Sequence, residues 1–170
     1  MKIAITDACV FIDLHDIELT TNFFSLHLEI HTSLDVMHEL YESHRSLLTR
    51  YLDSGKLIVH NLTEQDRNQI LTENYPKSLS QMDKTVLHLA LKMNAIVLSS
   101  DRVVRNFAKS KNLQFHGILW VFERLVDEQI IPSETACAKL IQLISSNVFY
   151  QNNPHLMKEV KSMLERWKTI

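Results

Sequence analysis

The sequence predicts an α/β fold: a parallel sheet of about four to five short strands sandwiched by helices, followed by a helical C-terminal extension. Three observations lead to this prediction. Up to Gly117, short apolar runs alternate with longer amphipathic stretches, which is the pattern of strands joined by helical crossovers. Beyond Gly117, the chain reads as almost wholly helical. Gly55 and Gly117 are the only glycines, which disfavours hairpin-rich all-β folds and excludes glycine-rich phosphate loops.

The N-terminal segment is expected to begin the sheet. Ile3–Thr6 is a short apolar run typical of a buried strand, and Ala8–Leu14 reads as a short helix after it. Glu18–Leu28 has helical character, His31–Thr32 reads as a brief strand, and Leu34–Tyr41 reads as a further helix.

A second series of helix, strand and helix follows. His44–Leu52 reads as a helix that Gly55 is well placed to end, because glycine readily adopts the left-handed conformation found after helices. Lys56–His60 is β-branched and apolar enough for a strand. Thr63–Glu73 has helix character, and Pro76 ends it.

The clearest helix is Ser80–Met93, because its apolar residues recur on one face. The strand Ile96–Leu98 and the helix Arg102–Lys111 come next. The extension is expected to contain further helices over Ile118–Glu128, Ser133–Ser146 and His155–Trp167.

Composition indicates one domain over residues 1–170, with a core over about 1–126 and a helical extension over about 127–170. Apolar content of 45% and charged content of 22% are ordinary for a soluble globule, and the formal net charge of −2 supplies no global basic field. Cys9 and Cys137 lack CxxC spacing and read as small core residues. No apolar run is long enough to span a membrane, and no signal peptide is recognisable, so a cytoplasmic protein is expected.

Acidic residues mark the predicted crevice of the sheet. Asp7 and Asp101 each end an apolar run, at the carboxyl ends of two expected strands, and Asp83 opens the long helix between them. Carboxylates gathered at one sheet edge repel each other and need a cation. A hard divalent cation would satisfy them, and its natural substrate is a phosphodiester.

Each acid also has an ordinary structural explanation. Ser80 and Asp83 have the spacing of a capping box, and Asp7 and Asp101 could be helix N-caps. Glu39 could simply be solvated on its helix. Taken singly, capping or exposure is the more usual role, but capping does not require several acids to meet at one edge of one small sheet.

These residues resemble the motifs of the PIN-domain family. Ile5–Asp7, Ser33–Leu40, Asp83 and Ile96–Asp101 match its motifs in order and spacing, including the Ser-x-Asp ending. The best-known small members are VapC-type toxin ribonucleases of toxin–antitoxin pairs. The stretch from Gly117 to Pro132 is similar to the longer variants, which carry extra C-terminal helices.

The resemblance implies that four acids form the quartet that binds Mg²⁺ or Mn²⁺ in PIN nucleases: Asp7, Glu39, Asp83 and Asp101. Ser99 matches the small hydroxyl residue that supports that site. Ala8 and Cys9 stand where many members have Thr, Ser or Asn, and we expect no comparable polar group from them. The fifth acid of some members is missing after Asp101, so a second metal would be weakly held or arrive with the substrate.

The chemistry expected of such a site is hydrolysis by a metal-activated water, with no side-chain nucleophile. Positive charge next to the acids is expected to contact RNA phosphates, and the candidates are Lys84, Arg102 and Arg105. A solvated helix face is an equally good explanation of these cations.

Two functions remain open. The first is a Mg²⁺- or Mn²⁺-dependent endoribonuclease, most simply the toxin of a toxin–antitoxin pair. For this function the resemblance implies an RNA substrate, a cognate antitoxin and a homodimer. The second is a non-catalytic PIN-like RNA- or protein-binding module whose acids only cap helices.

Overall fold

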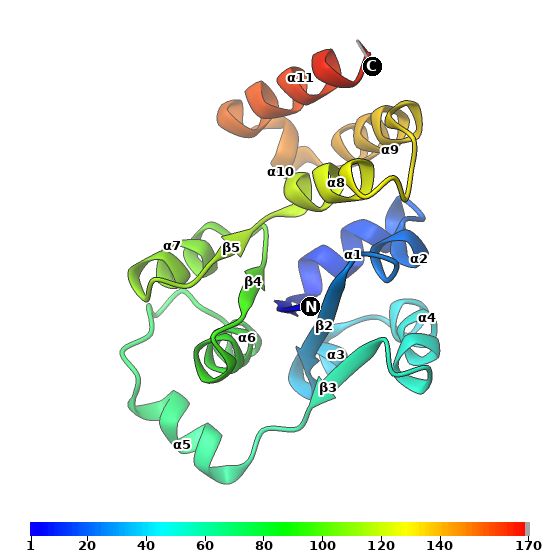
Figure 1. The fold of residues 1–170 in the computed structure, drawn as a ribbon. Helices are drawn as coiled ribbons and strands as arrows, with labels where there is room; N and C mark the ends of the chain where they lie inside the picture. Colours follow the sequence, from blue (N-terminus) through cyan, green and yellow to red (C-terminus); the bar gives the residue numbers. More distant parts are fainter. Residues whose placement is uncertain (169–170) are drawn as a thin grey trace. The chain divides into compact units, whose positions relative to one another are not determined.

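A computed structural model describes residues 1–168 (Figure 1). The chain forms two compact units, which we call unit 1 and unit 2. Unit 1 comprises Met1–Ile12 and His27–Ile118, and unit 2 comprises Asp13–Leu26 and the described part of Leu119–Ile170. The expectation of a single domain over residues 1–170 stays a prediction.

Within the described residues, unit 1 contains a five-stranded parallel sheet in the order β3-β2-β1-β4-β5. This confirms the predicted parallel α/β fold. The central strand β1 pairs with β2 on one side and β4 on the other, so that Ile5 lies between His31 and Val97. The strands are β1 (Lys2–Thr6), β2 (Leu28–Ser33), β3 (Leu57–His60), β4 (Ile96–Leu98) and β5 (Phe115–His116).

Helices flank the sheet of unit 1. The helix α6 packs against β1, β2, β4 and α3, and burial of six consecutive residues from Thr85 to Ala90 explains its central place. The unit's helices are α3 (Leu34–Glu39), α4 (Glu42–Asp53), α5 (Glu64–Thr72), α6 (Gln81–Met93) and α7 (Arg102–Ser110), and α1 (Ala8–Asp16) begins in it.

Unit 2 is helical among its described residues. The phenol of Tyr150 donates a hydrogen bond to the buried carboxylate of Asp13. Burial nevertheless raises the pKa of Asp13 to about 6. No described helix is both long and apolar enough to cross a membrane. The helices are α2 (Thr20–Phe23), α8 (Ile118–Asp127), α9 (Ser133–Ser146), α10 (Val148–Gln151) and α11 (Pro154–Lys168).

The predicted helix Glu18–Leu28 is wrong over most of its length. Only Thr20–Phe23 is helical, and Leu28 already pairs with Lys2 as the first residue of β2. Strand pairing with β1 extends β2 well beyond the brief strand expected at His31–Thr32 and overrides local helix propensity. The short elements β5 and α10 had no counterpart in the sequence prediction.

Local sequence signals explain most helix ends. Gly55 follows α4 with φ of +71°, as expected for a residue that ends a helix. Thr63 and Asp66 form a capping box at the start of α5, and Ser80 and Asp83 form another at the start of α6. Asn94 ends α6 in the left-handed conformation.

Buried hydroxyl groups join the elements that carry the acids. The hydroxyl of Thr32 donates to the carbonyl of Thr6 at 2.7 Å, which ties β2 to β1. The hydroxyls of Ser33 and Thr85 lie 2.6 Å apart, which ties the end of β2 to α6. Because these bonds are shielded from water, they fix how the ends of β1, β2 and α6 lie relative to one another.

Asp66 is the most heavily bonded charge in unit 1. It is 5% exposed, and Oδ1 accepts from His88 at 3.0 Å and from Lys92 at 2.8 Å, while Oδ2 accepts from Thr63. The hydrogen bond from Lys92, followed by that from His88, holds the pKa of Asp66 well below its ordinary value.

We expect Asp66→Asn to lower the free energy of unfolding at neutral pH by about 2–4 kcal/mol, because the buried His88 and the exposed Lys92 both lose their charged acceptor. The folded pKa is depressed, so this contribution is present above the unfolded pKa, near 4, and is lost as the pH falls below it. Urea denaturation of both proteins at neutral and acidic pH measures the difference. Asp53→Asn, on the exposed end of α4, is the control. Equal small effects of both variants would contradict the expectation.

Candidate functional site

The candidate site lies at the carboxyl edge of the sheet. Asp7 directly follows β1, and its N–H donates to the carbonyl of Leu98 on β4 at 3.2 Å. Ser99 and Asp101 come directly after β4, so both acids stand where adjacent strands end. The helices α3 and α6, which carry Glu39 and Asp83, pack against each other.

Asp7 is the buried member of the site, with 4% exposure. Its Oδ1 accepts a hydrogen bond from the thiol of Cys9 at 2.9 Å and another from the N–H of Val10 at 3.2 Å. Burial raises the pKa of Asp7 to about 6, although hydrogen bonds from Cys9, Ser99 and Val10 oppose the shift. The negative charge of Asp83 raises this pKa further.

Asp83 connects the acids electrostatically. Its Oδ2 accepts from the N–H of Ser80 at 3.0 Å and from the hydroxyl of Ser80 at 2.7 Å. The same carboxylate contributes to the raised pKa of Asp7 and to that of Glu39, where partial desolvation is the larger cause. The Asp83 carboxylate therefore lies within electrostatic reach of both Asp7 and Glu39, which come from two other segments.

Asp101 joins this group through Ser99. The hydroxyl of Ser99, which is fully buried, accepts the N–H of Asp101 at 3.0 Å and is also hydrogen-bonded to the Asp7 carboxylate. The Oδ1 of Asp101 accepts from Val103 at 2.7 Å and Val104 at 2.9 Å, so Asp101 is also the N-cap of α7. The structure thus links Asp101 to Asp7 by one serine.

Capping occupies one carboxylate oxygen each of Asp83 and Asp101. Asp83 caps with Oδ2 and Asp101 caps with Oδ1. Among the residues that the structure describes, the second oxygen of each has no hydrogen-bond partner. Helix capping is therefore the correct structural explanation of Asp83 and Asp101. Because each cap uses only one carboxylate oxygen, capping does not exclude a cation that both acids share.

The donor set is of the kind that a hard divalent ion prefers, because carboxylate oxygens are the usual ligands of Mg²⁺ and Mn²⁺. Among the described residues, however, no three of these acids bring their oxygens within 4.8 Å of one another. Asp7 is buried at the end of β1, while Glu39 is exposed at the end of α3.

Cys9 is a site residue that sequence reasoning missed. Its thiol donates to Asp7, and its sulfur accepts the N–H of Ser100 at 3.4 Å, so it bridges the segments that follow β1 and β4. The expectation that Cys9 supplies no polar contact here is therefore wrong. Its position two residues after Asp7, in the first turn of α1, was the signal available in the sequence.

The predicted basic residues differ in their surroundings. Arg102 is exposed in the first turn of α7, and Lys84 is half-buried directly after Asp83. The guanidinium of Arg105 lies over the ring of Phe115, 5.4 Å from its centroid, which holds this side chain against β5. Arg102 and Lys84 are therefore the better candidates for phosphate contacts.

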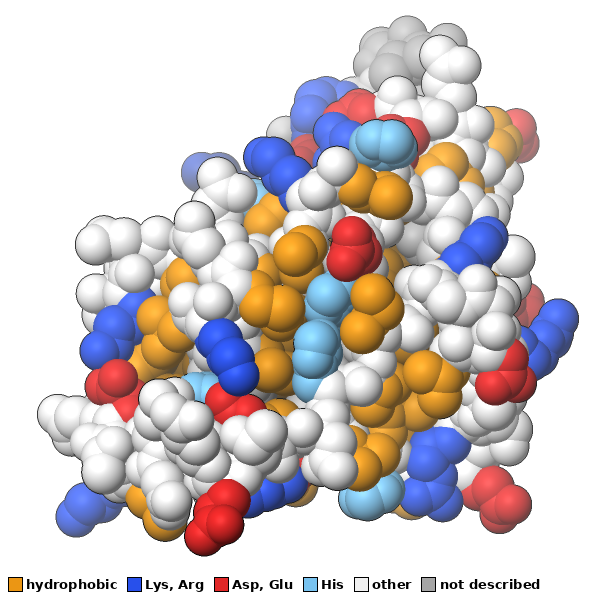
Figure 2. Space-filling model, turned by 60° about the horizontal axis from the view of Figure 1, so that its bottom comes forward, with side chains coloured by type: hydrophobic (Ala, Val, Ile, Leu, Met, Phe, Trp, Pro, Cys, Tyr) orange, Lys and Arg blue, Asp and Glu red, His pale blue; other side chains and the backbone are white. Residues whose placement is uncertain are grey.

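Two hydrogen-bonded histidines of unit 1, His31 and His60, are separate from the acidic site. His31 Nδ1 lies 2.9 Å from His60 Nε2, and His31 Nε2 lies 2.8 Å from a carboxylate oxygen of Glu29. Burial lowers the pKa of His60, and His31 lowers it further. His31, His60 and Glu29 satisfy one another on β2 and β3. Figure 2 shows one face of the molecule, on which histidine side chains lie among hydrophobic ones.

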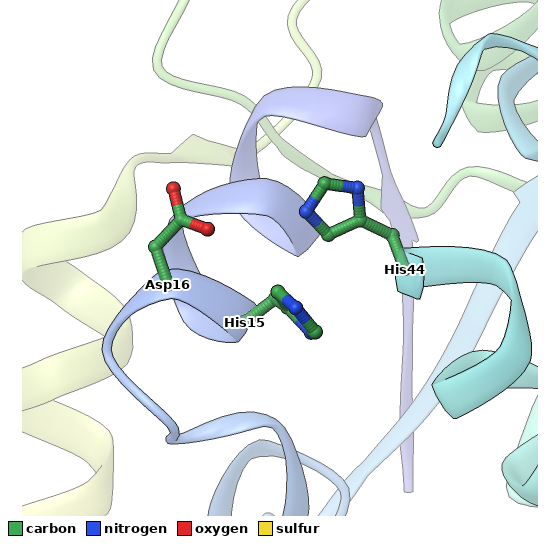
Figure 3. A group of neighbouring side chains, drawn as sticks. All are labelled: His15, Asp16 and His44. Atoms are coloured by element: carbon green, nitrogen blue, oxygen red, sulfur yellow. The ribbon is translucent and has the colours of Figure 1, made fainter. Parts of the chain in front are cut away.

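Further titratable side chains lie on α1 and α4. Figure 3 shows His15 and Asp16 at the end of α1 and His44 near the start of α4. His15 and Asp16 belong to unit 2 and His44 belongs to unit 1, so we assign them no common site.

Comparison with known proteins identifies a matching family model and two similar proteins. A family model described as a PIN domain (DUF3368) matches residues 3–166. Endoribonuclease Nob1 of Methanocaldococcus jannaschii is 33% identical over 92 residues, which are 53% of this chain and 46% of that protein. The chain thus spans about half the length of this curated relative. A PilT N-terminus domain protein from Sulfolobus solfataricus P2 has a TM-score of 0.44 and 13% identity, over 73% of this chain and 93% of that one.

We expect Asp7→Asn to stabilise the metal-free protein above about pH 6, by up to about 3 kcal/mol. The folded pKa of Asp7 is raised, so the folded state loses stability as the pH rises from about 4 to about 6, and Asn removes this loss. Melting temperatures in EDTA across this range measure the effect. Added Mn²⁺ should raise the melting temperature of the wild type but not of the variant. A variant that is less stable at every pH would contradict the expectation.

We expect Cys9→Ala to weaken Mn²⁺ binding by about 10-fold, because the Asp7 carboxylate loses a hydrogen-bond donor that orients it. Cys9→Ser keeps a donor at this position and should recover most of the affinity. Mn²⁺ titration followed by electron paramagnetic resonance measures the affinity directly, and Cys137→Ala in unit 2 is the matched control. Equal affinities for all three variants would show that the thiol does not orient Asp7.

Proposed function

The chain belongs to the PIN-domain family, and we propose that it is a Mg²⁺- or Mn²⁺-dependent endoribonuclease that hydrolyses RNA phosphodiester bonds. PIN domains are generally nucleases that use divalent metals. The observation that carries the proposal is that Asp7 and Asp101 follow adjacent parallel strands and are both hydrogen-bonded to Ser99. Asp83 and Glu39 lie on α6 and α3, which pack against each other. Capping by Asp83 and Asp101 at two separate helix starts does not require the acids to meet at one edge of the sheet.

Each residue of the site has a defined task in the proposed reaction. A bound divalent ion would supply an activated water and stabilise charge on the phosphate. Asp7 and Asp83 would hold the ion, and Asp101 would complete the set from the end of β4. Ser99 keeps the Asp7 carboxylate in place through its buried hydrogen bond. Glu39, which is exposed, is placed to orient a water molecule at the edge of the site.

RNA is the proposed substrate. Support comes from the relative named Endoribonuclease Nob1, although this chain spans about half of that protein. Arg102 and Lys84 follow two of the acids directly and are proposed to contact phosphates on either side of the scissile bond. Arg105, which lies over Phe115, is proposed to contribute less than these two.

The proposed biological role is that of a cytoplasmic toxin in a toxin–antitoxin pair. The motif resemblance to VapC-type ribonucleases supports this role, with a cognate antitoxin and a homodimer as the implied partners. In that role the antitoxin would hold the ribonuclease inactive until it is removed.

A non-catalytic PIN-like binding module is the second candidate. One observation favours it: Asp83 and Asp101 both cap helices, so both have a structural task without any metal. Such a module would bind RNA or protein equally well with and without divalent ions.

We expect Asp83→Asn and Asp101→Asn each to reduce Mn²⁺-dependent RNA cleavage by at least about 100-fold. At the N-cap position of Asp101, Asn caps a helix about as well as Asp. At Asp83, the third residue of its capping box, the amide oxygen of Asn can still accept from Ser80, so both variants should keep the fold and lose only the negative charge. The measurement is cleavage of a labelled RNA in Mn²⁺ and in EDTA, with Asp53→Asn on α4 as the control. Cleavage that persists in EDTA, or in both Asn variants, would contradict the proposal.

A further inference from the structure

Two histidines join the edge strand of unit 1 to its neighbour. The strand β3 lies at the end of the sheet next to β2, and it has only four residues. Because Ser33 pairs with His60 and side chains alternate along a strand, His31 of β2 and His60 of β3 lie on the same face of the sheet. The distance from His31 Nδ1 to His60 Nε2 is 2.9 Å. This side-chain hydrogen bond adds to the backbone pairing that holds β3 in place.

The donors and acceptors of this chain follow from its one carboxylate. An ionised Glu29 only accepts, so His31 Nε2, which lies 2.8 Å from it, is a donor. In a neutral imidazole the other ring nitrogen is then an acceptor, so His31 Nδ1 accepts from His60 Nε2. One extra proton, on Nδ1 of His60, leaves both bonds intact. A second extra proton places two N–H groups face to face, and the bond between the rings is lost.

The pair is poorly placed to carry two positive charges. His31 is 4% exposed, which makes an imidazolium there costly to solvate. Burial lowers the pKa of His60, and His31 and Lys92 lower it further. Because the pKa of His60 is depressed in the folded state, the folded protein loses stability as the pH falls below the ordinary value of about 6.5.

The charges around the pair come from three elements. Glu29 on β2 is bonded to the pair, and Lys92 on α6 and Asp66 on α5 act on His60 electrostatically. Among the described residues, none of the charges that shift the pKa of His60 lies on α4, which also packs against β3. The pKa of Asp66 is held well below its ordinary value, so Asp66 stays ionised and bonded to Lys92 and His88 at mildly acidic pH.

We propose that the His31–His60 pair is an acid-sensitive link between β2 and the edge strand β3, intact with at most one extra proton and broken by a second. Breaking the link loosens β3, whereas β1 stays paired with β2 and β4 on its two sides. His60 is paired in register with Ser33, the N-cap of α3, so the loosened end of β3 adjoins the start of that helix. This inference does not depend on the proposed function.

Hydrogen exchange of the full chain at pH 7 and pH 5 tests the link. Protection factors, which remove the intrinsic pH dependence of exchange, are compared for β3 (Leu57–His60) and for residues 3–5 of β1 as the internal reference. In the wild type, protection of β3 should fall roughly tenfold more than that of β1 on acidification. His60→Gln should abolish this difference, because an amide both donates and accepts and so stays bonded to either form of His31. His38→Gln, at an exposed site on α3, is the control and should behave as the wild type.

An NMR titration of the imidazole rings of the wild type is the second measurement, and it requires no variant to fold. The pair should take up its two protons in separate steps, with the second at the lower pH. Uptake of both protons together near pH 6.5, the ordinary pKa of about 6.5 for histidine, would overturn the inference. Equal changes of protection in β3 and β1, or a His60→Gln variant that keeps the pH dependence of the wild type, would also overturn it.

Discussion

The burial of one carboxylate, Asp7, is the constraint on which the rest of the site depends. An ionised acid that is 4% exposed is unfavourable unless hydrogen bonds or a cation stabilise it. Here Cys9, Val10 and Ser99 supply the hydrogen bonds, and the pKa of Asp7 still rises to about 6. A divalent ion would relieve the remaining free-energy cost of ionising Asp7 in the folded protein. Binding such an ion would therefore stabilise the fold.

The same side chains build the fold and the site. Asp83 and Asp101 each use one oxygen to begin a helix, which fixes the carboxylate relative to its strand or helix without further packing. Ser99 then joins the ends of β1 and β4 through hydrogen bonds to Asp7 and Asp101. Because Asp83 and Asp101 are held by their own helix starts, these two carboxylates are fixed in place before any ligand arrives.

The sequence predicts the sheet better than the connections. Local signals can be recognised in a single sequence. They include the apolar runs of β1 and β4 and the helix caps at Ser80 and Asp101. The start of β2 cannot be predicted from the local sequence, because pairing with β1 overrides the helix propensity of this segment. Cys9 was missed for a similar reason, since its contact with Ser100 joins segments that are distant in the sequence.

The most direct test of the metal site is a crystal structure of the protein soaked in Mn²⁺, with anomalous diffraction data. The proposed site predicts a peak bounded by the carboxylates of Asp7 and Asp83, within coordination distance of about 2.2 Å of their oxygens. Data without a peak there, at a Mn²⁺ concentration that saturates ordinary sites, would contradict it and leave the acids as helix caps alone.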